Sequence, residues 1–168
     1  MLGNFKSLVS LYLSSNKIKN LNIFSEEENF PVLRRLEIAS NKIGELPVIK
    51  CPRLEYLDAS DNKIDKHETW TGHANLKTLK LTENKFKTLA AFANLPSLEF
   101  LDVGNNNIGV FGGFNDLAKL KYFSLEGNKI DKIEEEIPDL ASIEELNLSN
   151  NKIVSLENLR NIFKYETL

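Results

Sequence analysis

Apolar and polar positions follow one pattern seven times along the chain. In the first copy, leucines at positions 8, 11 and 13 are followed by an asparagine at 16 and an isoleucine at 18. The other copies begin at Leu33, Leu54, Leu76, Leu98, Leu120 and Ile143. Their asparagines are separated by 25, 21, 22, 22, 22 and 23 residues. Seven copies in one register exceed chance, so the pattern indicates a repeat architecture.

Each copy predicts one short strand. The alternation in Leu79-Lys80-Leu81 is typical of a strand with one buried face. Because the pattern returns one repeat later, each strand must run parallel to the one before it. A second apolar set after the asparagine predicts the opposite wall: Phe86, Leu89, Phe92 and Leu95 in one copy, and Ile108, Phe111, Phe114 and Leu117 in the next. A single repeat cannot bury this face, so stacked neighbours must stabilise it.

Two polar rows support the same stacking. The asparagine of each copy is expected to satisfy backbone groups of its own and the adjacent turn, in a structural ladder of Asn16, Asn41, Asn62, Asn84, Asn106, Asn128 and Asn151. The residue after the first leucine alternates in sign through Arg34, Glu55, Lys77, Glu99, Lys121 and Glu144. Opposite charges would therefore face each other on neighbouring strands.

This repeat resembles the short, 22-residue class of leucine-rich repeat proteins. The resemblance covers nearly the whole chain. It implies an α/β leucine-rich repeat solenoid, right-handed, with about seven parallel concave strands and short 3-10 or irregular convex segments. We expect a single domain, 1–168, with repeats starting near 8, 33, 54, 76, 98, 120 and 143 and partial repeats at both ends.

The partial repeats carry the same apolar spacing. Leu2 and Phe5 match the convex half of a preceding repeat. Leu156 and Leu159 continue the apolar spacing after Ile153, and Leu168 falls where an eighth strand would begin. The usual terminal caps of the family are not recognisable in this sequence, and solenoids need covered ends. We expect a segment of a longer protein or a component of a multiprotein complex.

Successive side chains of a strand point to opposite faces of the sheet, so the sequence also indicates which side chains project from the concave face. The predicted protein-binding face consists of Tyr12, Arg35, Glu37, Tyr56, Asp58, Lys80, Phe100, Asp102, Tyr122, Ser124, Glu126, Glu145 and Asn147. Three of its aromatic residues form a stripe beside an acidic row, which predicts a polypeptide partner with apolar anchors flanked by Lys or Arg. The alternative is that the aromatic rings merely cover the sheet and each other.

Composition narrows the partner class. The net charge is −3, and no long basic run occurs. The sequence therefore shows no positively charged surface that would attract nucleic acid or an anionic membrane. Lysines follow six of the asparagines (Lys17, Lys42, Lys63, Lys85, Lys129 and Lys152), and we interpret them as a solvated rim. No apolar stretch approaches ~18 residues, which argues against a membrane span.

Catalytic chemistry has little support. His67 and His73 flank Trp70, but two ligands without a third donor are too few for a specific metal site, so a convex turn with Trp70 in the core is favoured. Asp58 and Asp102 would lie about 10 Å apart, as glycosidase carboxylates do, yet Lys80 stands between them. We predict no catalytic residues, no cofactor and no metal.

Three functions remain open. The favoured one is a non-catalytic scaffold in a larger assembly, and the class includes axonemal proteins, which makes the cilium and cytoskeleton candidates. The second is a regulatory subunit that binds an enzyme such as a protein phosphatase. The third is a component of nuclear or ribonucleoprotein complexes. The single cysteine, Cys51, and the absence of a recognisable signal peptide favour a reducing compartment, the cytoplasm or the nucleus, over the exterior. Of these two we expect the cytoplasm.

Overall fold

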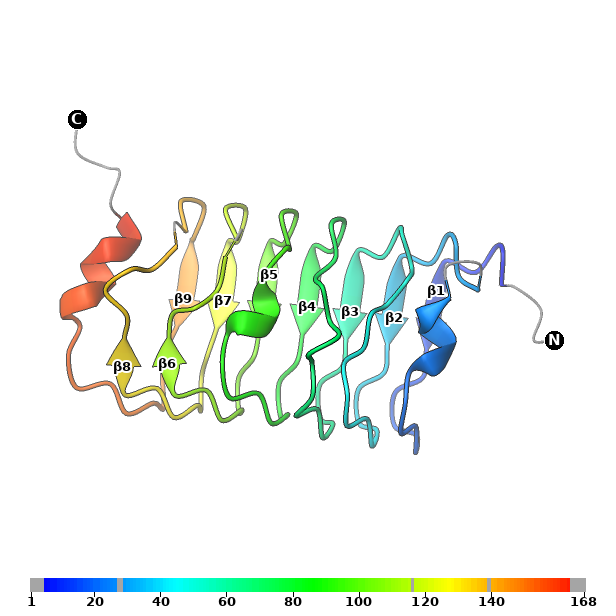
Figure 1. Ribbon diagram of the computed structural model, residues 1–168, viewed down its shortest axis with the longest axis horizontal. Coiled ribbons are helices and arrows are strands. Elements are labelled where there is room, and N and C mark those ends of the chain that lie inside the picture. The colour runs from blue at the N-terminus through cyan, green and yellow to red at the C-terminus, as the bar shows by residue number, and fades with distance from the viewer. Residues whose placement is uncertain (1–4, 27–28, 116, 139, 164–168) are drawn as a thin grey trace.

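The computed structural model describes residues 5–26, 29–115, 117–138 and 140–163. Over this part the chain winds into a solenoid, with short strands side by side along one face and irregular segments along the other (Figure 1). The predicted fold class is confirmed. Seven parallel strands form the concave sheet in the order β1 (Ser10–Tyr12), β2 (Arg35–Glu37), β3 (Tyr56–Asp58), β4 (Thr78–Lys80), β5 (Phe100–Asp102), β7 (Tyr122–Ser124) and β9 (Glu145–Asn147).

The register follows the sequence repeat without a slip. The central residues of neighbouring strands pair, from Leu11 with Leu36 through Leu57, Leu79 and Leu101 to Phe123 and Leu146. In the five strands β2, β3, β4, β5 and β7 this central side chain is fully buried. Because strand side chains alternate, the first and third residues of each strand face the concave side.

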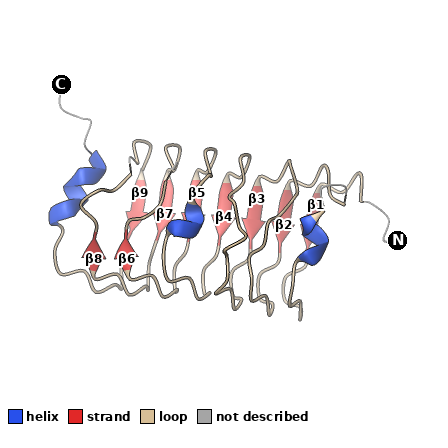
Figure 2. Ribbon diagram, in the orientation of Figure 1, coloured by secondary structure: helices blue, strands red, loops and turns tan. Residues whose placement is uncertain are grey.

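The convex wall is less regular. It contains the 3-10 helices η1 (Asn22–Ser25), η2 (Ala90–Phe92) and η3 (Glu157–Phe163), joined by loops (Figure 2). It also contains two very short parallel strands, β6 (Val110–Phe111) and β8 (Lys132–Ile133). Neither was predicted, because two residues are too few for a hydrophobic period to register.

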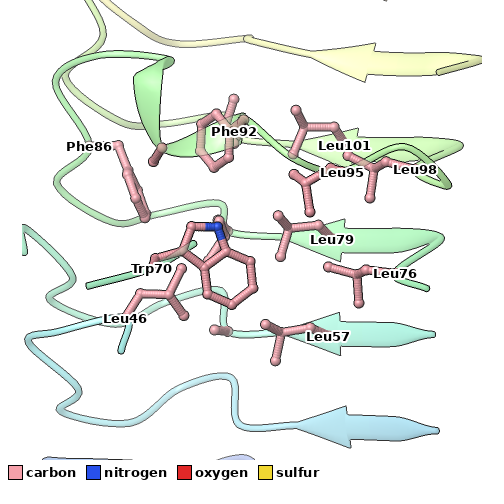
Figure 3. Packing of buried hydrophobic residues seen from close by; sticks show 14 of the residues in the cluster. Leu46, Leu57, Trp70, Leu76, Leu79, Phe86, Phe92, Leu95, Leu98 and Leu101 are labelled. Carbon is pink, nitrogen blue, oxygen red and sulfur yellow. The ribbon is translucent and has the colours of Figure 1, made fainter. Parts of the chain in front are cut away.

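One apolar core fills the space between the two walls. Leu57, Leu79 and Leu101 enter it from the strands, while Trp70 and Phe86 enter from the convex side (Figure 3). Every residue of the predicted second apolar set is buried, which confirms that part of the prediction. Full burial of such a side chain contributes roughly 1.5–3 kcal/mol, so successive turns add comparable amounts of stability.

Asparagine side chains join the turns where the strands end. Asn106 Nδ2 donates to the carbonyl oxygens of Leu81, Val103 and Gly104, and its Oδ1 accepts the N–H of Phe86 at 3.0 Å. The same set of bonds recurs, and the buried members are Asn41, Asn62, Asn84, Asn106 and Asn128.

The two end members of the ladder differ from the central ones. Asn151 keeps the full set of bonds but is only half-buried. Asn16 is exposed and donates only to the nearby carbonyls of Leu13 and Ser14. No described turn stacks on its outer side, so its amide has nothing to bridge.

The segments that match partial repeats are only partly described. Phe5 stacks on Phe30 with ring centroids 5.3 Å apart, and Leu159 packs partly against the core. Leu156 is 62% exposed. Leu2 and Leu168 lie outside the described residues. None of the helices that the structure describes is long and apolar enough to span a membrane.

Candidate protein-binding face

The parallel register arranges the concave side chains in straight rows. The first strand residues form one row, in which Tyr56, Thr78, Phe100 and Tyr122 are consecutive partners. The third strand residues form a second row, in which Asp58, Lys80, Asp102 and Ser124 are consecutive partners. The structure therefore brings the aromatic stripe and the acidic row together on one face, side by side.

The aromatic rings form two groups with cations between and beside them. Phe100 and Tyr122 stack in parallel with centroids 4.2 Å apart. Thr78 separates this pair from Tyr56, and the Lys80 ammonium bridges the gap at 5.5 Å from the Phe100 ring and 5.9 Å from the Tyr56 ring. Arg35 covers the Tyr56 ring at 3.6 Å. The rings thus cover one another in part, yet each stays half-exposed to solvent.

The acidic side chains are held in place by local bonds. Glu37 pairs with Arg35 through Nε at 2.7 Å, and Asp58 Oδ1 accepts the N–H of Ser60 at 3.0 Å. Glu126 accepts hydrogen bonds from the side-chain amides of Asn147 at 3.1 Å and Asn150 at 3.0 Å. Fixed carboxylates cost little further ordering when a partner arrives.

Asp102 lies in the middle of the face and is partly buried. Burial raises its pKa above the ordinary value, and the nearby Glu126 charge acts in the same direction. The N–H of Gly104, the Ser124 side chain and the Lys80 charge oppose that shift. No described cation forms an ion pair with Asp102. An incoming cationic group would therefore stabilise the charged carboxylate and offset the cost of its burial.

The predicted members of the face differ in their exposure to solvent. Ser124 is only 3% exposed, because its side chain is too short to pass its register neighbours Asp102 and Asn147. It serves instead as a hydrogen-bond partner of Asp102. At the two ends of the sheet, Tyr12 is 62% exposed and Glu145 is exposed.

Gly104 and Asn150 belong to the site although the predicted face did not include them. A Cβ at Gly104 would lie 3.3 Å from both Asp102 Oδ1 and the Glu126 carbonyl oxygen, so a side chain would crowd the central carboxylate. The sequence signal was a glycine where other repeats place Ser60 or Thr82. No feature of the sequence indicated that Asn150 would donate a hydrogen bond to Glu126.

The histidines lie away from this face, as expected. His67 stacks on Phe86 with centroids 5.4 Å apart, and Trp70 is buried. His73 Nε2 lies 2.8 Å from the carbonyl oxygen of Cys51, and burial lowers the His73 pKa. Burial also raises the pKa of Cys51 to about 12, which leaves its thiol protonated and unreactive.

Similar proteins were found by family and by structure. The leucine rich repeat family matches residues 66–108 and 112–153, which together make up half of the chain. No curated protein matches the sequence. A leucine-rich repeat protein of Leptospira interrogans superposes with a TM-score of 0.59 at 22% identity, over 93% of this chain and 47% of that one. This chain therefore spans about half the length of that protein.

Two further structures are more distant. The functional domain of InlJ from Listeria monocytogenes, which includes a cysteine ladder, has a TM-score of 0.47 at 19% identity, over 91% of this chain and 42% of that one. The leucine-rich repeat domain of APL1B has a TM-score of 0.42 at 19% identity, over 94% of this chain and 65% of that one.

These findings establish the family without identifying a partner. At 22% identity, the similarity to the Leptospira protein shows the fold alone. Proteins with this repeat are generally non-catalytic and bind other proteins, typically on the concave face. The family match and the parallel solenoid agree, and this chain belongs to the leucine-rich repeat family.

Proposed function

We propose that the concave face binds a polypeptide segment that carries apolar and basic side chains. The observation that supports this most is the placement of Asp102, a partly buried carboxylate without an ion pair to any described cation, beside the stacked rings of Phe100 and Tyr122. A ligand with one apolar and one cationic side chain satisfies both features at once.

The aromatic part would supply most of the affinity. Tyrosine and similar large rings dominate binding energies because they bury a large area with few rotatable bonds. The Phe100–Tyr122 stack presents one continuous apolar surface, and Tyr56 presents a second across the Lys80 side chain. One strand lies between these two surfaces, so they are about 10 Å apart at a sheet spacing of about 5 Å per strand. This distance suits anchors two turns apart on a helix, because each helical turn rises about 5.4 Å.

The charged part would supply orientation. Carboxylates of Asp58, Asp102 and Glu126 lie along the same face, with Lys80 in register between the first two. A partner cation placed next to Asp102 and Glu126 meets two negative groups, whereas one placed next to Lys80 is repelled. Complementarity of this kind raises association rates and fixes register more than it adds affinity.

More specifically, we propose that the protein is a non-catalytic scaffold in a larger cytoplasmic assembly, for which the cytoskeleton and the cilium are candidate locations. Cys51 is the single cysteine of the sequence and is free and buried, which agrees with a reducing compartment. Regulation of an enzyme such as a phosphatase, and membership of a nuclear complex, remain alternatives that the same face could serve. Microscopy of the tagged protein, followed by affinity purification, distinguishes these roles.

A double substitution tests the concave face. Peptides rich in Leu, Lys and Arg are selected by phage display on the unaltered protein and used as labelled probes in fluorescence anisotropy. Tyr56→Ala with Phe100→Ala should weaken them by about tenfold or more, because both aromatic anchors are removed. The matched control removes two exposed apolar side chains elsewhere, Ile23→Ala with Val154→Ala, and should bind normally. Unchanged affinity in a folded concave-face variant would falsify the proposal.

A further inference from the structure

The turns that lead into the strands form a second candidate surface, which we call the entry ledge. It comprises Arg34 and residues 51–55, 71–77, 94–99 and 118–121, and it lies along the edge of the sheet where strands β2, β3, β4, β5 and β7 begin. The asparagine ladder lies along the opposite edge, where the strands end. Figure 1 shows these narrow turns following one another along the solenoid.

An apolar pocket occupies one part of the entry ledge. It has a volume of about 470 Å³, and Gly72, Ala74, Pro96 and Ala118 are among the residues that line it. Pockets for small molecules typically have volumes of roughly 300–1,000 Å³, so this pocket has room for a large apolar side chain.

A polar pocket of about 290 Å³ occupies the adjoining part. Arg34, Arg53, Glu55 and Lys77 line it. The two pockets meet within single turns, because Ala74 lines the first and Asn75 the second, and because Pro96 lines the first and Ser97 the second. Together the two adjoining pockets form an apolar-and-polar groove along the turns that precede β2, β3, β4, β5 and β7.

This groove is cationic although the whole chain carries a net charge of −3. Its described lining residues include four cations, Arg34, Arg53, Lys77 and Lys119, and one acidic residue, Glu55. Glu55 is already paired with Arg34 and, at 3.0 Å, with Lys77. The nearby Glu99 is paired with Lys121 at 3.2 Å. Within the described part of the chain, Arg53 and Lys119 form no ion pair and are available to a ligand.

The groove is held rigid by bonds between turns. His73 Nε2 contacts the Cys51 carbonyl oxygen at 2.8 Å, and Asn75 Nδ2 donates to the Pro52 carbonyl oxygen at 2.8 Å. Gly72 has a φ of +80° and packs so closely on the next turn that a Cβ would lie 2.5 Å from the Ala93 carbonyl oxygen. A preformed groove loses little conformational entropy on binding.

We propose that the entry ledge binds an acidic polypeptide segment with a large apolar side chain next to its Asp or Glu residues. The apolar side chain enters the 470 Å³ pocket, and the carboxylates pair with Arg53 and the neighbouring cations. Arginine suits this role because its planar fork can bind a carboxylate through two hydrogen bonds. The ledge and the concave face would thus select ligands of opposite charge.

Charge reversal on the ledge is the first test. The probe is a labelled short peptide with one phenylalanine beside several glutamates, followed by fluorescence anisotropy at low ionic strength. Arg53→Glu with Lys77→Glu should weaken binding by about tenfold or more. The control, Lys63→Glu with Lys85→Glu, makes the same charge change at exposed positions after the strands and should keep most of the affinity.

Filling the apolar pocket is the second test. Ala74 is exposed and lines the pocket, so Ala74→Trp should block it while the fold stays intact. Ala141 is exposed, holds the same place in the turn before β9 and does not line the pocket, so Ala141→Trp is the matched control. The first should weaken the probe by about fivefold or more and the second should not. With a probe that carries serine in place of phenylalanine, the Ala74→Trp and Ala141→Trp variants should bind with equal affinity.

Several results would overturn this proposal. One is equal loss of affinity in both charge-reversal variants, which would indicate non-specific attraction. Another is equal competition by an RNA oligonucleotide, which would indicate that the ledge recognises phosphate rather than acidic peptide. No binding by the unaltered protein would also refute it. The Tyr56→Ala, Phe100→Ala variant should bind the acidic probe normally, so this test is independent of the concave face.

Discussion

At the scale of single residues, the asparagines of the ladder satisfy several backbone groups each and hold neighbouring turns together. Each central member makes three donor contacts and one acceptor contact, as Asn106 does with Leu81, Val103, Gly104 and Phe86. Backbone groups in a buried turn need such partners, because an unpaired polar group there costs about 1–3 kcal/mol. One side chain thereby joins two successive turns.

We expect Asn106→Ala to lower the free energy of unfolding by about 1–3 kcal/mol, since it leaves the Phe86 N–H and several carbonyls unpaired. Asn16→Ala is the matched control, because Asn16 is exposed and bonds only within its own turn. Urea unfolding followed by circular dichroism measures both. Equal midpoints for Asn106→Ala and the unaltered protein would contradict this role.

At the scale of elements, the turns before the strands differ from those after them. The turns after the strands repeat one bonding pattern, whereas the turns before them vary in sequence and in the pockets that they form. Gly72 shows the constraint most clearly, because it combines a positive φ with a close approach to Ala93 and Asn94. Only glycine occupies such a position without strain.

We expect Gly72→Ala to destabilise the protein more than Gly113→Ala does. Both glycines have positive φ, at +80° and +72°, so both variants incur a similar backbone penalty of roughly 1–3 kcal/mol. Only Gly72 adds a steric clash, because a Cβ at Gly113 meets nothing within 4 Å. Thermal unfolding compares them, and a larger loss for Gly113→Ala would show that close packing at Gly72 is unimportant.

At the scale of the whole molecule, stability should vary along the solenoid. Central strand residues such as Leu57, Leu79 and Leu101 are fully buried between two neighbours, whereas Leu11 and Leu146 in the outermost strands are only partly buried. In solenoids each turn contacts only its neighbours, so the outer turns lose one of two stabilising interfaces.

Amide hydrogen exchange measures this difference. We expect the slowest exchange in β3, β4 and β5 and the fastest in β1 and β9, because opening an outer turn breaks fewer contacts. Mass spectrometry of peptic fragments resolves the strands. Uniform protection from β1 to β9 would mean instead that the solenoid opens as a single cooperative unit.

The solenoid also separates its charges. Acidic side chains such as Asp58 and Asp102 lie on the concave face, while Arg34, Arg53 and Lys77 gather on the entry ledge. The net charge of −3 conceals this division, because it averages the two surfaces. Two proposed sites of opposite sign on one rigid body fit a scaffold better than a single-ligand receptor.

Much of the site could be predicted because its rows follow from strand alternation. Asp58, Lys80 and Asp102 were expected as consecutive neighbours, and the register places them so. The burial of Ser124 could not be predicted, because it depends on the size of its neighbours across the sheet. The stacking of Phe100 on Tyr122 at 4.2 Å likewise depends on side-chain conformation, which spacing does not specify.

The sequence by itself determined the repeat, the parallel sheet and the inward apolar rows, because a hydrophobic period of fixed length allows only one register in which every turn is covered. Only the tertiary structure decided where pockets form and which charges remain unpaired. Ala74, Arg53 and Ser97 are far apart in the chain and unremarkable in any single repeat. Their juxtaposition on the entry ledge arises from the stacking of irregular turns, whose shapes no periodicity encodes.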